Sequence, residues 1–133
     1  MIADFLTIIN REMKKIEVPY ALHRWTGTVP NLYAIGEFME SPRTTEDFAC
    51  EYTMMITITA RERVLFATLE MYRDMIEQVF DPIEGLREKT YSGSGGSVAI
   101  FYENAFLIET GEANLMRMQI NLRIKQWKTF GGK

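Results

Sequence analysis

Apolar residues at helical spacing open the chain. They recur at steps of three and four residues, which places them on one face of a helix: Ile2, Phe5, Ile9, Met13 and Ile16. Pro19 limits this helix, because the residue before a proline is pushed toward extended geometry. The same spacing returns between Arg63 and Phe80, with the stripe Leu65, Leu69, Tyr72, Ile76 and Val79 or Phe80. The pattern therefore predicts two helices, the second of which ends at Pro82.

Elsewhere apolar and polar side chains alternate, which is typical of strands with one buried face. The stretch from Phe48 to Ala60 has an apolar face made of Tyr52, Met54, Ile56, Ile58 and Ala60. The most regular alternation lies near the end of the chain, where the apolar side is Met116, Met118, Ile120, Leu122 and Ile124. Further strands are predicted at 31–39 and 97–102, and 106–109 either continues the latter or starts another. Residues 19–30 read as a short extended piece followed by a turn.

The order helix, strands, helix, strands predicts an α+β fold. We expect an antiparallel β-sheet with the N-terminal helix and one central helix packed on one face. The length of 133 residues suits a single domain covering 1–133. Within it, Ser92 to Gly96 is predicted to be a flexible loop, because glycine and serine supply little packing. Residues 129–133 are expected to form a frayed tail.

Composition and charge narrow the classes of function. The hydrophobic share of 47% is that of a globular domain and argues against disorder of the whole chain. The net charge is −3, and no run of basic residues is longer than Lys14-Lys15, so the sequence shows no basic stripe of the kind that nucleic-acid binders carry. A local basic face formed on folding stays open as an alternative. No segment approaches the roughly 20 apolar residues of a membrane helix, so we expect no membrane partner.

The sequence offers little catalytic chemistry. His23 is the only histidine and Cys50 the only cysteine, so neither a metal site nor a disulfide is expected. The glycine-rich Ser92–Gly96 lacks the lysine and the following helix of a phosphate-binding loop. We therefore predict no catalytic residues, no cofactor and no enzymatic activity. A small enzyme that uses His23 or a carboxylate as base is the least favoured hypothesis.

Two features are candidate partner-binding sites. The first is the polar side of the last strand, which carries Arg117, Gln119, Arg123, Lys125 and Trp127, with Asn121 between them. Arginine and tryptophan are favoured at interface anchors, although a solvent-facing sheet surface explains this row equally well. The second is the loop made of Ser92, Gly93, Ser94, Gly95 and Gly96, which is either an assembly loop or a plain connector.

The chain resembles small phage and prophage tail-completion proteins, also called tail terminators or head-tail joining proteins. The resemblance rests on Trp25-Thr26-Gly27, the strand Glu51 to Thr59 and the helix Arg63 to Phe80. It is most telling in the closing part, which runs from Ser97 to Phe106, through Thr110-Gly111-Glu112, and from Arg117 to Lys128. It covers most of the chain as a pattern of elements.

This resemblance implies a structural protein that forms a homo-oligomeric ring, usually of six subunits, at the head-proximal end of a tail tube. Such a ring stops tube growth and joins the tail to the neck or connector. The implied partners are further copies, the tail tube protein and the neck or connector protein, while DNA passes through the lumen without specific binding. The implied location is the virion, with the host cytoplasm during assembly. A neighbouring neck (head-completion) protein and a small non-enzymatic adaptor domain remain the alternatives.

Overall fold

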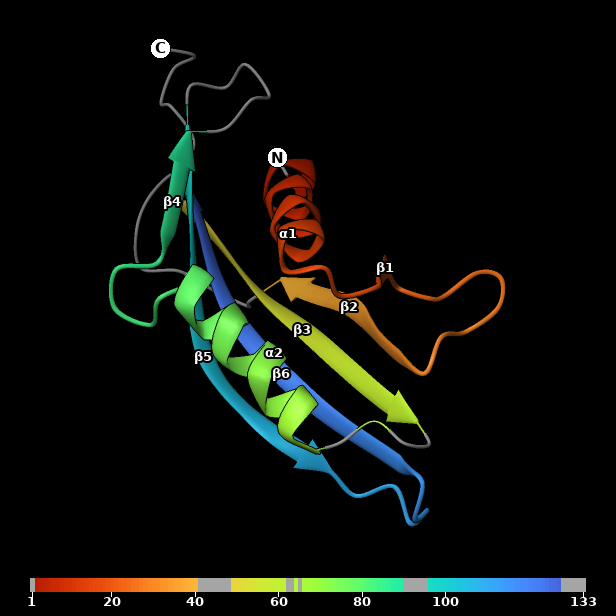
Figure 1. Ribbon diagram of the computed structural model, residues 1–133. Coiled ribbons are helices and arrows are strands. Elements are labelled where there is room, and N and C mark those ends of the chain that lie inside the picture. Colours follow the sequence, from red (N-terminus) through yellow and green to blue (C-terminus); the bar gives the residue numbers. More distant parts are fainter. Residues whose placement is uncertain (1, 41–48, 62–63, 65, 90–95, 128–133) are drawn as a thin grey trace.

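The computed structural model describes residues 2–40, 49–61, 64, 66–89 and 96–127, and Figure 1 shows how their helices and strands are arranged. Along the chain, these are α1 (Ile2–Ile16), β1 (Tyr20–Leu22), β2 (Leu32–Glu40), β3 (Ala49–Arg61), α2 (Phe66–Val79), β4 (Leu86–Lys89), β5 (Ser97–Ile108) and β6 (Leu115–Trp127). The protein is a mixed α/β fold, and the prediction of two helices is confirmed.

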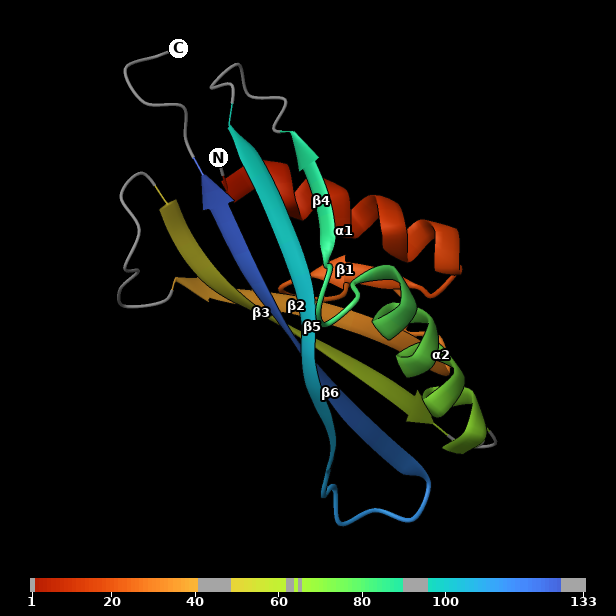
Figure 2. The ribbon, with the colours of Figure 1, turned by 90° about the vertical axis from the view of Figure 1, so that its left-hand side faces the viewer.

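The strands form one curled six-stranded sheet in the order β1-β2-β3-β6-β5-β4 (Figure 2). All neighbours are antiparallel except β1 and β2, so the prediction of a purely antiparallel sheet is wrong at this pair. The reason is local. Residues 23–31 return the chain to the end at which β1 began, so β2 runs beside β1 in the same direction. The pair starts where Ala34 N donates to Pro19 O at 2.7 Å.

The sheet is also more extensive than the sequence indicates. Its outer strand β4 is short and charged, and no alternation marks it before its pairing with β5 is known. The strand β5 continues to Ile108 as one element, which settles whether 106–109 extends it. It does so through a β-bulge between Tyr102 and Asn104, which shifts the pairing with β6 by one residue.

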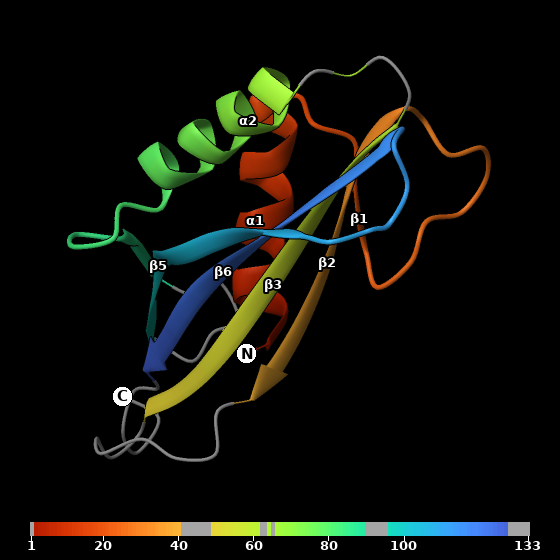
Figure 3. The ribbon, with the colours of Figure 1, turned by 90° about the horizontal axis from the view of Figure 1, so that it is seen from below.

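The core lies between one face of the sheet and both helices, as Figure 3 shows. The predicted apolar sides of β3 and β6 point into it and are buried, with Met116 half-buried at one end. The helices contribute fully buried side chains that were also predicted, including Phe5, Met13, Leu69 and Ile76. Leu65 of the predicted stripe lies outside the described residues. Because both described helices pack on the same face, no helix in the described part of the chain lies on the opposite face of the sheet.

The turn into β4 depends on Gly85. Its φ is +71°, and a Cβ there would lie 2.8 Å from two ring carbons of Phe101 and 3.0 Å from Ile100 O. We expect Gly85→Ala to lower the free energy of unfolding by about 2–4 kcal/mol, since left-handed backbone strain and overpacking add. Gly111 is the matched control, because its φ is +73° but no described atom lies within 4 Å of the added Cβ. Gly111→Ala should cost only about 1–2 kcal/mol. Equal losses in urea unfolding of the two variants would contradict the packing argument.

Burial of Tyr20 makes the stability of the fold sensitive to alkaline pH. Burial raises the pKa of Tyr20 to about 12 from 10.0. The phenol therefore stays neutral in the folded chain at pH values where the unfolded chain ionises. Its contribution to stability is complete below pH 10 and is lost as pH rises from 10 toward 12. Tyr20→Phe should flatten this loss in urea unfolding measured at a series of pH values. An unchanged pH slope would contradict the expectation.

Candidate interaction surface

The face of the sheet opposite the helices, here called the open face, collects the alternate side chains of the long strands. Strand register places Glu37 of β2, Glu51 of β3 and Phe101 of β5 on this side, together with the polar row of β6. The row consists of Arg117, Gln119, Asn121, Arg123, Lys125 and Trp127. Most of these side chains are half-buried and Arg123 is exposed, so they form a continuous surface of long polar side chains.

Hydrogen bonds between side-chain amides connect the middle residues of the polar row of β6. Gln119 Nε2 donates to Asn121 Oδ1 at 2.9 Å, and Asn121 Nδ2 donates to Asn104 Oδ1 of β5 at 2.8 Å. These bonds link two residues on β6 and reach across to the neighbouring strand. They fix the side chains in position before any partner arrives, which lowers the entropy that binding costs.

An aromatic ring between two guanidinium groups forms the next part of the open face. The Arg123 guanidinium carbon lies 4.8 Å from the ring centroid of Phe101, and that of Arg87 lies 5.4 Å from it. Phe101 is only 7% exposed, and both these arginines and the turn at Gly85 lie against its ring. Glu51 Oε1 lies 3.9 Å from Arg123 Nη1. Cation–π contacts at exposed sites contribute roughly 0.5–1 kcal/mol each, which favours these positions of the arginines over the ring.

At the end of β6, the Lys125 ammonium lies 5.3 Å from the ring centroid of Trp127. The open face therefore combines cations with aromatic rings. Its cations are Arg61, Arg87, Lys89, Arg117, Arg123 and Lys125, whereas Glu37 and Glu51 are the carboxylates that strand pairing places on it. This face is basic although the whole chain carries a net charge of −3. Such a surface is complementary to an acidic partner.

Most of the predicted loop Ser92–Gly96 lies outside the described residues. Ser92, Gly93, Ser94 and Gly95 lie outside the described residues, and Gly96 is buried immediately before β5. The structure therefore places the polar row of β6 on one face of the sheet. The role of the loop in assembly stays a prediction.

His23 and Cys50 occupy structural positions. His23 has a φ of 69°, its N–H donates to Gly36 O at 2.8 Å, and its ring centroid lies 5.8 Å from that of Phe38. It therefore closes β1. Cys50 is half-buried in β3. Burial, followed by the proximity of Cys50, raises the pKa of Tyr52.

Charged networks on the helix side attach the helices to the sheet. Arg11 of α1 pairs with Glu88 of β4, and this contact is the largest cause of its raised pKa. Arg73 of α2 donates to Tyr102 Oη at 3.2 Å and to Glu77 at 2.8 Å, which raises its pKa in the same way. These carboxylates thus have structural partners and lie apart from the open face.

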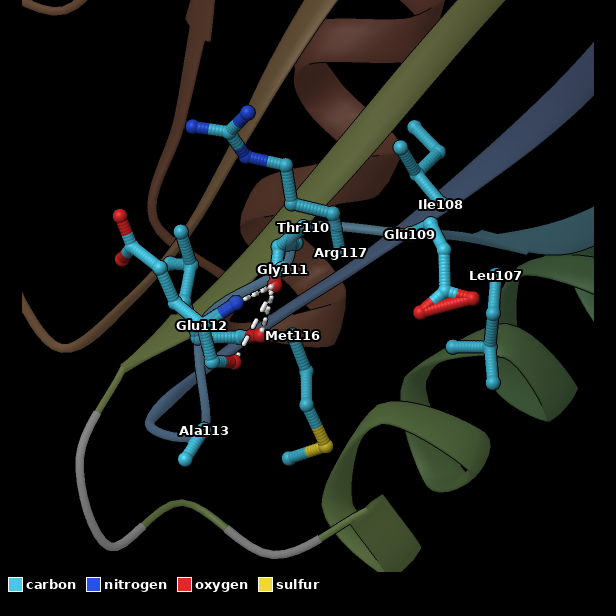
Figure 4. A pocket seen from close by; sticks show the side chains of 10 residues that line it. Leu107, Ile108, Glu109, Thr110, Gly111, Glu112, Ala113, Met116 and Arg117 are labelled. Carbon is cyan, nitrogen blue, oxygen red and sulfur yellow. Dashed lines mark hydrogen bonds between the residues drawn. The ribbon is translucent and has the colours of Figure 1, made fainter.

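The turn between β5 and β6 encloses a shallow hollow of about 370 Å³ (Figure 4). Thr110 Oγ1 braces the turn: it donates to Leu115 O at 2.8 Å and accepts from Glu112 N at 3.2 Å. Glu109, Leu107 and Met116 lie on one side of it, and Arg117 points to the other. The lining combines the carboxylates of Glu109 and Glu112 and the guanidinium of Arg117 with aliphatic and thioether groups.

Two absences hold for the described part of the chain. It contains no group of three or more His, Cys, Asp or Glu side chains placed to hold a metal ion. Neither of its helices is long and apolar enough to cross a membrane.

Sequence reasoning missed the residues of β4 and β5 that complete the open face. Phe101 has the opposite parity to Val98, Ile100 and Tyr102, so the predicted strand 97–102 already implies that Phe101 lies on the other face. The position of Arg87 could not be predicted from the sequence, because the four residues of β4 show no pattern that indicates a strand.

Comparison with known proteins gives the fold alone. No protein-family model matches the chain, and no curated protein matches its sequence. Nine chains of solved structures match its three-dimensional structure. One of them, whose name describes no function, superposes with a TM-score of 0.69 over 96% of this chain and 93% of its own, at 13% sequence identity. The whole domain thus has a counterpart of similar length and architecture.

Proposed function

We propose that this protein is a structural assembly subunit that forms a ring at the head-proximal end of a phage tail tube. In this role it stops tube growth and joins the tail to the neck or connector. The family resemblance in the sequence supplies the identity of the partners. The ring subunits would be six copies of the chain, and DNA would pass through the lumen without specific binding.

The observation that carries the proposal is the open face. Both helices pack on the same side of the sheet, so the long strands β3, β6 and β5 present a broad surface that no helix or strand of the described residues covers. That surface holds arginines stacked on an aromatic ring and a tryptophan beside a lysine. Arginine and aromatic residues are enriched at protein interfaces, and their fixed positions favour binding without rearrangement.

The charge of the open face also suits contact with protein. Its cations would meet an acidic surface of the tail tube or the connector, which steers association and selects the partner. The chain as a whole remains acidic, with a net charge of −3. Like charge lowers non-specific affinity for DNA, as a conduit for the genome requires.

The test is particle size and shape. Light scattering after size exclusion should show self-association at high protein concentration or in the presence of tail tubes. Electron micrographs should then show rings at one end of each tube. Rings that bind isolated connectors but no tubes would reassign the protein to the neck. A monomer that binds neither would overturn the proposal.

A further inference from the structure

The outer edge of β5 is only half covered. Strand β4 pairs with Ser97–Ile100, and Tyr102 N then donates to Phe80 O at 2.7 Å. Beyond that point, no strand among the described residues lies along the outer side of Ala105–Ile108 (Figure 2). An unpaired edge presents backbone N–H and C=O groups that can bind another strand.

The opposite edge of the sheet is β1, which pairs with β2 and has no other strand beside it among the described residues. Since Ala34 N donates to Pro19 O, the backbone groups of Pro19 face β2. Backbone groups alternate along a strand, so those of Tyr20 and Leu22 point outward. Leu22 O accepts from Arg24 N at 2.8 Å, which leaves the Tyr20 N–H and C=O and the Leu22 N–H at this edge.

The uncovered parts of β5 and β1 lie at the same position along the strand direction. Strand register forms a continuous cross-strand row from β5 to β1 through Leu107, Met118, Ile58, Ala34 and Tyr20. The next row of the same parity runs through Ala105, Ile120, Ile56, Gly36 and Leu22. A second copy placed beside the first with the same orientation would therefore bring its β1 level with the uncovered half of β5, without a shift along the strands.

The backbone groups of β5 match this placement. Opposite residues of an antiparallel pair point either both toward or both away from each other. The backbone N–H and C=O of Ala34 point toward β1, so those of its partner Ile58 point toward β6. The backbone groups of Met118 therefore point toward β3, and those of Leu107 point outward from the sheet. Two residues earlier, Ala105 faces outward as well. Leu107 and Ala105 on one edge, and Tyr20 and Leu22 on the other, thus have backbone groups that point outward at the positions that would meet.

We infer that copies of this chain join edge to edge, with β5 of one copy pairing antiparallel to β1 of the next. Leu107 then lies opposite Tyr20, and Ala105 lies opposite Leu22. This inference rests on the proposed ring and names the contact that builds it. The joined edges differ, so the contact is head-to-tail, the kind that closes into a ring by rotation. It leaves the open face of each copy available for the tail tube or connector.

The side chains at the two edges are complementary. Leu107 is 52% exposed on the helix side of the sheet, and the other edge has on that same side an apolar groove of about 290 Å³. The groove is lined by Leu6, Thr7, Asn10, Tyr20 and Leu22. On the open face, Phe106 is 49% exposed and would lie opposite Ala21, whose small side chain leaves room for the ring. Pairing would bury both apolar side chains.

Disulfide cross-linking tests the register. In a Cys50→Ala background, Phe106→Cys and Ala21→Cys would meet as a non-hydrogen-bonded pair with Cα atoms about 4.5 Å apart, within the range for a disulfide. Under mild oxidation, a mixture of the two single-cysteine proteins should give a covalent dimer, while each alone should not. One protein carrying both cysteines should give a ladder that ends at the size of the ring. A dimer from Phe106→Cys alone would overturn the head-to-tail arrangement in favour of two β5 edges.

A charge at the edge gives a second test that needs no disulfide. Leu107→Lys should abolish self-association in light scattering while circular dichroism remains that of the wild type, because charged residues block edge pairing. Ile83→Lys is the matched control: Ile83 is 80% exposed in the turn between α2 and β4, and this variant should assemble normally. Normal assembly of Leu107→Lys would overturn the inference.

The outcomes separate this inference from the proposed function. Rings that form in electron micrographs while the cysteine mixture stays uncross-linked would overturn the β5–β1 pairing and leave the proposed function standing. Absence of rings, alone and with tail tubes, together with absence of cross-links would overturn both. Cross-linked rings that bind no tail component would support the pairing and count against the tail role.

Discussion

Phe5→Ala is expected to lower the free energy of unfolding by about 3–5 kcal/mol, the usual cost of truncating a buried phenylalanine. Phe5 is fully buried, and its ring centroid lies 5.6 Å from that of Phe38 and 4.9 Å from that of Tyr52. It therefore fastens α1 to two neighbouring strands, β2 and β3. A domain has a total stability of about 5–15 kcal/mol, so this one change removes a large part of it.

Urea unfolding followed by circular dichroism measures the effect, and Phe66→Ala is the matched control. Phe66 begins α2 and is 46% exposed, so its truncation leaves no closed cavity and should cost well under half as much. A loss for Phe5→Ala no greater than that for Phe66→Ala would contradict the docking of α1 described above. Helical signal that persists after the sheet signal is lost would contradict the two-state behaviour on which the comparison depends.

The elements that the sequence predicted are those whose burial is one-sided. Strand β6 has the core on one face and long polar side chains on the other, so its alternation is regular from Met116 to Lys125 and breaks only at the ends, at Leu115 and the buried Gln126. Helix α1 likewise has one buried stripe, and Pro19 marks its limit. In both cases one physical cause, burial along a single face, sets the spacing of apolar residues that a sequence shows.

The elements that escaped prediction are set by tertiary pairing. The four residues of β4 become a strand because β5 lies beside them, and local composition does not favour it. The parallel β1–β2 pair depends on where the loop between them returns the chain, which a residue pattern does not encode. The bulge after Tyr102 decides which residues of β5 face outward, and it too is visible only once β6 is in place.

The candidate surface was predictable to the same extent. The polar row of β6 followed from alternation, and register places its members on one face. The contacts of two guanidinium groups with Phe101 were not predictable, because the arginines come from β4 and β6, which lie on either side of β5 only in the folded sheet. The apolar groove beside β1 was equally hidden, since α1 and β1 form it together.

Arg123→Glu is expected to weaken binding to tail tubes by about 30-fold or more, the loss of roughly 2 kcal/mol that defines an interface hot spot. Arg123 is exposed at the centre of the open face, where its guanidinium lies over Phe101 and near Glu51. Reversing its charge removes the stacked cation and adds a second carboxylate beside Glu51. An acidic partner would then meet repulsion where it now meets attraction.

Co-sedimentation of the protein with purified tail tubes measures this loss, and wild-type binding should itself weaken as ionic strength rises, because salt screens exposed charges. Lys14→Glu is the control: it makes the same change in net charge on the exposed side of α1, away from the open face, and should bind like the wild type. Both variants should remain folded, with a stability change of about 1 kcal/mol or less, as is usual for surface positions. Because Arg123 lies on β6, away from the β5 and β1 edges that pair, Arg123→Glu should still form rings in electron micrographs, now detached from the tubes. Rings of this variant that cap the tubes as well as the wild type does would show that the open face is not the docking surface.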